Sequence, residues 1–148
     1  MNVSKTLPLS VVRVGGFWGQ RIENIANEVI PFQWKALNDQ IPGAEPSHAI
    51  ENFRIASGQS SGKFYGLIFQ DSDVGKWIEA AAYTLALQRD PALEKLLDET
   101  VALIGSAQQA DGYLNTHYTA VEPDKRWSNL RDCHELYCAG HLIEGAVA

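Results

Sequence analysis

Apolar side chains recur at helical spacing over much of this 148-residue chain. Between residues 17 and 39 they stand mostly three or four positions apart, which predicts a helix. These positions are Ile22, Ile25, Val29, Ile30 and Leu37. Pro31 should kink or interrupt the helix, because proline has no amide proton to donate. The opening residues 7–14, LPLSVVRV, instead predict a short N-terminal strand that ends at Gly15 and Gly16.

Residues 71–90 form the clearest helical pattern, with a wide apolar face on one side. Asp71 or Ser72 is the predicted N-cap. A second helix is predicted from Pro91, with Asp90 suited to cap it. The predicted buried stripe of this helix consists of Leu93, Leu96, Leu97, Val101 and Ile104. Because only a few residues join the two helices, we expect an antiparallel hairpin.

Polar stretches with little periodicity separate the helices. Residues 40–66 are rich in Gly, Ser and Pro, with a short helical turn predicted near HAIENFRIA. Residues 108–129 form a second irregular stretch with an Asp-Gly turn. A last helix is predicted from about residue 130 to the end. One side of it is apolar and includes Leu136, Tyr137, Gly140, Ile143 and Val147.

This alternation of tight turns and long loops predicts a mainly α fold. Helical hairpins of this kind build α-solenoids and α/α-barrels, in which the loop end carries the site. A free-standing four-helix bundle is the alternative. We favour part of a barrel, because the pattern stops at Ala148 within a helix that has no cap.

Composition narrows the classes of partner. The net charge of −6 comes without a cluster of Lys and Arg, so no nucleic-acid partner is expected. No apolar run reaches the roughly 20 residues that a membrane span needs, and the N-terminus lacks a clear secretion signal. We therefore expect a cytoplasmic protein without a membrane partner. Cys133 and Cys138 lie five residues apart on a predicted helix and face different directions, so no disulfide is expected between them.

The last predicted helix also carries a candidate metal site. His134, Cys138 and His141 stand at i, i+4 and i+7, so they share one stripe of the helix. Two of these side chains could reach one metal ion. Cysteine is also a common buried residue, and packing of Cys138 and His141 in a helix interface is the favoured alternative.

Two carboxylates, Asp71 and Asp73, stand at the start of a predicted helix. Capping is the favoured interpretation, although one carboxylate can cap a helix and still bind a sugar hydroxyl. Trp77 follows in the apolar stripe and is predicted to belong to the core rather than to a sugar site.

The loop sequence DGYLNT places three chemically useful side chains together. Asp111, Tyr113 and Asn115 combine an aromatic ring with hydrogen-bonding groups, as carbohydrate sites do. A turn with polar residues is the favoured interpretation of this stretch.

Several blocks of the chain agree in order and spacing with one known family. They include FQDSDVGKWIEAAAYTLA, AQQADGYLNT and RDCHELYCAGHLIEGAVA, joined by FWGQRIENIANEVIPFQWKALND and SHAIENFRIASG. Together these blocks resemble the N-terminal part of the bacterial β-L-arabinofuranosidases of glycoside hydrolase family 127. The resemblance runs across nearly the whole chain.

The resemblance implies an (α/α)6 barrel followed by β-rich domains, in chains several times this length. Residues 1–148 would be the N-terminal portion of the catalytic domain, and incomplete. Family members release L-arabinofuranose from non-reducing ends with retention of configuration. Their nucleophile is a cysteine bound to Zn²⁺, whose other ligands are a glutamate and further cysteines, and a separate glutamate is the acid/base. The resemblance puts all of these beyond residue 148, so neither a catalytic residue nor a metal ligand is expected here.

The resemblance also assigns substrate contacts within this chain. His134, in HELY, matches a family histidine that contacts the sugar in the subsite where cleavage occurs. Phe69, Gln70 and Asp73, in FQDSDV, should lie near the mouth of the same pocket. Gly75 departs from the family, which usually has a bulky aromatic there. Either the substrate preference differs or the packing at Gly75 is looser.

The sequence thus predicts a segment of a retaining glycoside hydrolase for L-arabinofuranosides or related sugars. Lacking the nucleophile and the acid/base, this chain alone should be inactive. Apolar faces at an open barrel edge would favour self-association, so a homo-oligomer is expected. The rival hypothesis is a non-catalytic helical module that binds a sugar or a protein. A reading frame that continues past Ala148 with zinc-ligand cysteines and a glutamate would favour the enzyme, and a stop codon the module.

Overall fold

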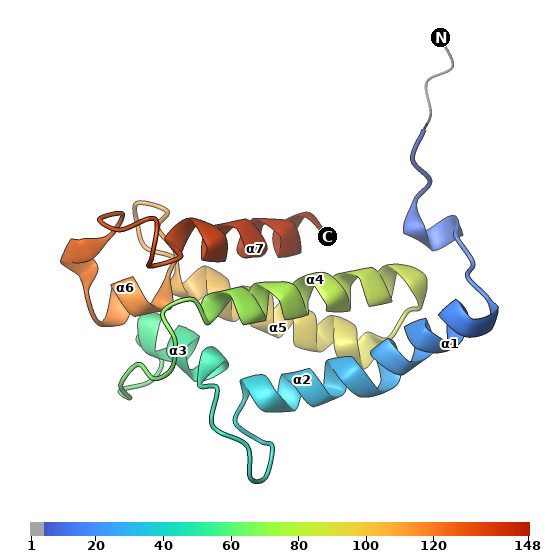
Figure 1. Cartoon of the computed structure of the whole chain (residues 1–148), viewed down its shortest axis with the longest axis horizontal. Coiled ribbons are helices and arrows are strands. Elements are labelled where there is room, and N and C mark those ends of the chain that lie inside the picture. The colour runs from blue at the N-terminus through green and yellow to red at the C-terminus, as the bar shows by residue number, and fades with distance from the viewer. Residues whose placement is uncertain (1–4) are drawn as a thin grey trace.

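A computed structural model describes residues 5–148, and every regular element in that range is helical (Figure 1). The longer helices are α1 (Gly16–Asn24), α2 (Ile30–Leu37), α3 (Ala49–Ala56), α4 (Asp71–Leu87), α5 (Pro91–Ala107) and α7 (Glu135–Val147). The shorter elements are α6 (Thr116–Ala120), the 3-10 turns η1 (Leu9–Val11) and η3 (Pro123–Lys125), and the π-helical turn η2 (Ile25–Val29).

The predicted N-terminal strand over residues 7–14 is wrong. Its centre forms the single 3-10 turn η1, closed by a bond of 3.1 Å from the Val11 amide to the Pro8 carbonyl. A strand needs a neighbouring strand to satisfy its backbone groups. The described residues 5–148 contain no other strand that could pair with this one.

The predicted helix over residues 17–39 is present, and Pro31 interrupts its regularity as expected. The π-helical turn η2 joins α1 to α2 immediately before the proline. Proline cannot donate to the carbonyl four residues earlier, and a π-helical turn is one way for a helix to accommodate such a break. The two helices therefore continue as one long, irregular rod along the molecule (Figure 1).

Helices α4 and α5 form the predicted antiparallel hairpin (Figure 1). Asp90 caps α5 as predicted, because its Oδ1 accepts from the amides of Ala92 at 2.9 Å and Leu93 at 3.2 Å. One member of the predicted buried stripe is misplaced, since Val101 is 52% exposed. The remaining members, Leu93, Leu96, Leu97 and Ile104, pack against the core.

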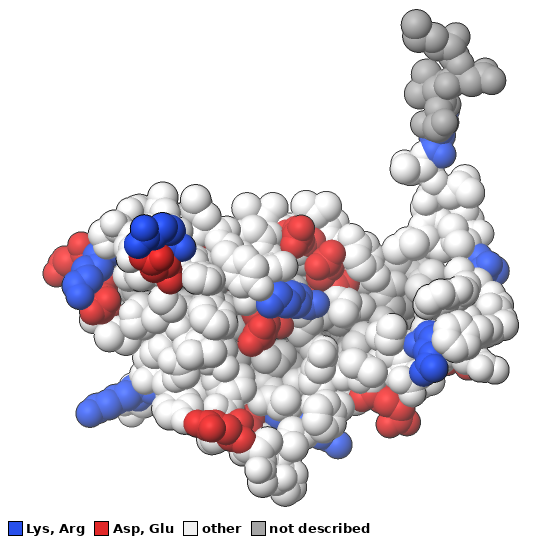
Figure 2. All heavy atoms as spheres, viewed as in Figure 1, with Lys and Arg blue, Asp and Glu red and all other residues white. Residues whose placement is uncertain are grey.

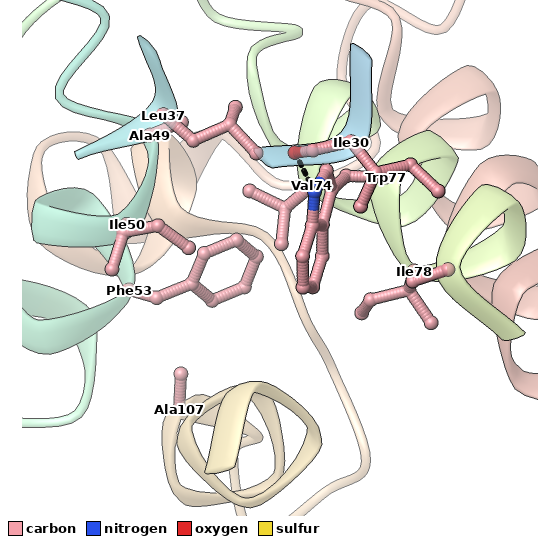
Figure 3. Packing of buried hydrophobic residues seen from close by; sticks show 10 residues of the cluster. Ile30, Leu37, Ala49, Ile50, Phe53, Val74, Trp77, Ile78 and Ala107 are labelled. Carbon is pink, nitrogen blue, oxygen red and sulfur yellow. Dashed lines mark hydrogen bonds between the residues drawn. The ribbon is translucent and has the colours of Figure 1, made fainter. Parts of the chain in front are cut away.

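The core lies where α2, α3, α4 and α5 meet (Figure 3). It consists of Ile30, Leu37, Ala49, Ile50, Phe53, Val74, Trp77, Ile78, Ala81 and Ala107. Trp77 is only 1% exposed, so its predicted place in the core is confirmed. Its indole N–H donates to the carbonyl of Ile30 at 3.1 Å, which satisfies the polar end of a buried ring.

Helix α7 packs along α4 at a distance that only glycine allows. A Cβ built at Gly75 would lie 2.9 Å from the backbone carbonyl carbon and oxygen of His141. A Cβ at Gly145 would lie 2.9 Å from the carbonyl oxygen of Gly75. Gly75 is buried, so the prediction of looser packing at this position is wrong. The small residue instead brings two helix backbones together.

The last helix begins later than predicted. Its first helical residue is Glu135 rather than one near residue 130, because His134 takes a left-handed conformation with φ of 58°. The side that contacts α4 includes Cys138 and Gly145, which are both buried. The predicted apolar side is mostly exposed, with Leu136, Tyr137, Ile143 and Val147 at 43–81% exposure.

The predicted loop end is a real feature of the molecule. Helices α4 and α7 both begin at the end where α3, α6 and the long loops gather, and the tight α4–α5 turn lies at the other end (Figure 1). On the face drawn in Figure 2, acidic and basic side chains are interspersed without a continuous basic area. Within residues 5–148, no helix has the length and apolar character to cross a membrane.

Candidate functional site

The structure brings His134 and Phe69 together at the loop end. Their rings stack, with centroids 5.1 Å apart and planes inclined by 29°. Phe69 lies just before α4 and His134 is the N-cap residue of α7, so this His134–Phe69 stack depends on the packing of those two helices. Both side chains are half-buried and keep part of their surface open.

One nitrogen of His134 already has a partner. Nδ1 lies 2.8 Å from the backbone carbonyl oxygen of Asp132. A carbonyl can only accept, so Nδ1 carries the proton in this contact. In the neutral ring, Nε2 is then an acceptor that is free to receive a hydrogen bond from a hydroxyl group.

A row of polar and aromatic side chains continues from the stack along α4 and α7. The Tyr137 ring lies edge-on to His134, with centroids 5.9 Å apart. The ammonium of Lys76 lies 5.2 Å from the centre of the Tyr137 ring and 3.3 Å from Oδ1 of Asp73. Asp73 is therefore linked to the His134–Phe69 stack through Lys76 and Tyr137.

Gln70 and Asp73 line a cavity of about 810 Å³ beside the N-terminal half of α4. We call it the α4 cavity. Its other lining residues are Gln33, Ala36, Leu37, Glu45, Pro46, Ser47, Tyr65, Gly66, Leu67, Lys76 and Trp77. Neither Phe69 nor His134 is among them. The four predicted site residues thus divide into a stacked pair and two cavity residues, joined by the contacts of Lys76.

The side chain of Gln70 holds two loops rather than reaching freely into the cavity. Its Oε1 accepts from the amide of Leu67 at 2.9 Å, and its Nε2 donates to Oγ of Ser47 at 3.2 Å. Both groups of the amide are in use. The role expected for Gln70 is therefore carried out alongside a structural one.

Asp71 does not cap α4, and neither does Ser72, so that prediction is wrong. The N-cap residue is Gln70, and it makes no side-chain capping bond. The buried carboxylate of Asp71 instead accepts from the amide of Thr116 at 2.7 Å and from its hydroxyl at 2.5 Å. Burial raises the pKa of Asp71 to about 6, although the two bonds from Thr116 oppose the increase.

The DGYLNT stretch is a structured turn, as the favoured interpretation predicted. Oδ1 of Asp111 accepts from the amide of Tyr113 at 3.0 Å, and Asn115 caps α6 by accepting from the amide of Tyr118 at 3.0 Å. Tyr113 and Asn115 are both buried. They therefore shape the loop end from within and do not present a sugar-binding surface.

The candidate metal stripe on the last helix is not assembled. His134 precedes the helix, and Cys138 is fully buried between α7 and α4. Burial, with the nearby Asp71 carboxylate, raises the pKa of the Cys138 thiol to about 12, so it stays protonated at neutral pH. Within residues 5–148, no three His, Cys, Asp or Glu side chains are arranged to hold a metal ion.

Sequence reasoning missed Lys76, Tyr137 and Ser47 as neighbours of the site. Tyr137 stands three residues after His134, and Lys76 stands three residues after Asp73. Residues three apart share a helix face, so this spacing was an available signal. Ser47 lies in an irregular loop, where no such periodicity exists.

Comparisons with known proteins agree with this geometry. A family model described as "Beta-L-arabinofuranosidase, GH127 catalytic domain" matches residues 11–148. A curated protein of Bifidobacterium longum subsp. longum, the non-reducing end β-L-arabinofuranosidase, is 44% identical over 164 aligned positions. That alignment covers 100% of this chain and 24% of the curated protein.

Two solved structures are similar as well. A GH127 β-L-arabinofuranosidase from Geobacillus stearothermophilus T6, called Ara127N-Se, matches with 67% identity and a TM-score of 0.89. The GH127 β-arabinofuranosidase BT3674 matches with 34% identity and a TM-score of 0.82. These matches cover 90% and 95% of this chain, but 21% and 23% of the respective relatives. The chain thus spans less than a quarter of either solved relative.

Proposed function

The chain belongs to the β-L-arabinofuranosidase family GH127, and we propose that it forms part of the sugar pocket of a retaining glycoside hydrolase. The proposed reaction releases L-arabinofuranose, or a related sugar, from non-reducing ends. The observation that carries the proposal is the His134–Phe69 stack at the loop end, next to Asp73 and Lys76.

The chemistry of these side chains suits a carbohydrate. Sugar rings present apolar C–H faces, which favour contact with aromatic surfaces, and hydroxyl groups that both donate and accept hydrogen bonds. Phe69 offers an aromatic surface, and Nε2 of His134 offers an acceptor. The carboxylate of Asp73 can accept further hydroxyl bonds at the edge of the α4 cavity.

The residues of this chain do not fit the zinc centre that the family implies. The only buried thiol, Cys138, is enclosed by α4 and keeps its proton. We propose that the nucleophile, the acid/base and the Zn²⁺ ligands belong to sequence beyond residue 148. The part played by this chain is to bind and orient the sugar. A cytoplasmic location and a homo-oligomeric state remain predictions.

Binding can be tested on the purified chain by NMR titration with methyl β-L-arabinofuranoside. We expect chemical-shift changes centred on His134 and Phe69. His134→Ala should weaken binding by roughly tenfold, the effect of losing one hydrogen bond and one ring contact. His141→Ala is a matched control, because this second histidine of α7 pairs with Glu144 at 3.0 Å. Equal losses in both variants would contradict the proposal.

Catalysis is tested separately with 4-nitrophenyl β-L-arabinofuranoside. Retaining hydrolysis needs two positioned carboxyl or equivalent groups flanking the glycosidic bond. We therefore expect no turnover by residues 1–148 alone, with or without added Zn²⁺. Measurable release of 4-nitrophenol would show that this chain holds catalytic groups that we assign elsewhere.

A further inference from the structure

Glu135 is a buried carboxylate next to His134 that the proposed function does not use. It is 2% exposed, although it stands at the first position of α7. Oε1 accepts from the hydroxyl of Tyr113, and Oε2 accepts from the backbone amide of Trp127 at 2.8 Å. Both donors come from irregular segments rather than from α7. The carboxylate therefore ties the start of the helix to two stretches of loop.

The Tyr113 side of this connection is enclosed by further contacts. The Arg126 guanidinium lies over the Tyr113 ring, 4.2 Å from its centre, and the Trp127 ring meets it edge-on at 5.1 Å. Burial, reinforced by the hydrogen bond to Glu135, raises the pKa of Tyr113 above its usual value. Tyr113 thus keeps its proton at neutral pH and remains a donor to Glu135.

The loop that Glu135 ties down has two strained backbone positions. Trp127 has φ of 62° and His134 has φ of 58°, both in the left-handed region that residues with a Cβ rarely adopt. Such conformations persist only where surrounding contacts hold them. Glu135 supplies contacts at both positions, because it accepts the amide of Trp127 and directly follows His134.

We propose that Glu135 is a positioning residue for His134. By accepting from Tyr113 and Trp127, it fixes the segment 126–134 and holds His134 in the left-handed conformation. In that conformation the His134 ring stacks on Phe69, and its Nδ1 donates to the Asp132 carbonyl. This inference rests on the proposed function for its purpose, but not for its geometry.

The test replaces Glu135 by glutamine in the 148-residue chain. Gln has one acceptor oxygen for two donors, and its NH₂ group faces a donor, so one bond must break. We expect the NOEs between the rings of His134 and Phe69 to lose most of their intensity. Binding of methyl β-L-arabinofuranoside should weaken by roughly tenfold, as expected when a binding group is misplaced.

Two further variants separate positioning from general stability. In Glu135→Gln combined with Tyr113→Phe, one donor is gone, so the remaining Gln oxygen can accept from Trp127 and the His134–Phe69 NOEs should recover. Thr100→Val removes a buried hydroxyl that bonds the Leu96 carbonyl within α5. It should lower stability without changing those NOEs.

Each outcome decides one of the two ideas. Unchanged His134–Phe69 NOEs in folded Glu135→Gln would overturn the positioning role. If that variant does not fold, Tyr113→Phe alone must weaken the NOEs, and unchanged NOEs there would overturn the role equally. If the NOEs respond to these substitutions but the parent chain shows no response to the arabinofuranoside, the positioning role stands and the proposed function fails.

Discussion

Helices α4 and α7 touch through glycine along their length, yet both begin at buried carboxylates. In the shared interface, Gly75 and Gly145 let the two backbones approach closely. At the loop end, Asp71 and Glu135 stand at the first position of each helix and accept hydrogen bonds from segments far away in sequence. One interface depends on shape, and the other depends on matching donors to acceptors.

The contrast has a functional meaning. Close packing fixes the relative position of two helices, but it cannot set the conformation of the loops that lead into them. The buried carboxylates do so, because Asp71 binds the start of α6 and Glu135 binds the segment before α7. The His134–Phe69 stack lies at this polar end. Its geometry should therefore respond to protonation and to loss of single hydrogen bonds, whereas the glycine interface should respond only to volume.

The strongest way to break the contrast is to add volume at Gly75. Gly75→Leu would drive a side chain into the His141 backbone, where even a Cβ lies at 2.9 Å. Overpacking typically costs about 1–3 kcal/mol, and a contact with backbone leaves little room to adjust. We expect the free energy of unfolding, measured in urea, to fall by more than about 3 kcal/mol.

The control for this prediction is Gly140→Leu on α7. A Cβ at Gly140 meets nothing within 4 Å, so the added side chain has open space. Replacing a helical glycine gains up to about 1 kcal/mol of helix propensity. Gly140→Leu should therefore be neutral or stabilising. Equal destabilisation at both positions would mean that the close approach of α4 and α7 is not what Gly75 provides.

The next largest effect should come from the pH dependence at Asp71. Burial raises its pKa to about 6 from an ordinary value of 3.8, so the folded state binds this proton more tightly than the unfolded state. The contribution of Asp71 to stability is then greatest below about pH 4 and is lost as the pH rises to about 6. The whole change corresponds to at most about 3 kcal/mol.

Asp71→Asn provides the measurement, because asparagine does not ionise. The free energy of unfolding of the parent minus that of the variant should decrease between pH 4 and pH 7. Asp98→Asn, at an exposed position of α5, should leave the parent pH profile unchanged. A difference curve that is flat, or that rises with pH, would show that the Thr116 bonds outweigh burial at Asp71.

The helices themselves were predictable from local sequence. Periodic apolar positions identified α4 and α5, Pro31 marked the irregular turn, and Trp77 was placed correctly in the core. These features depend on residues within a few positions of one another. The strand prediction failed because a strand needs a partner elsewhere in the chain.

The arrangement of the site was less predictable. His134 and Phe69 were named only because the sequence resembles a known family, and their mutual stacking was not foreseen. Asp71 looked like a cap, but Thr116, 45 positions later, provides better donors in the folded chain. Hydrogen bonds over such separations leave no periodic trace in the sequence. Single-sequence reasoning therefore fails where distant loops converge.

The smallest predicted effect sharpens the contrast from the opposite end of the molecule. Asp90 caps α5 at the tight α4–α5 turn, by bonds confined to its own next three residues. Asp90→Ala should lower the free energy of unfolding by about 1 kcal/mol, the usual value of an N-cap. Because this cap touches no loop of the site, the His134–Phe69 NOEs should stay as in the parent chain. If they weaken, the two ends of α4 are coupled, and the loop end is not organised by its buried carboxylates alone.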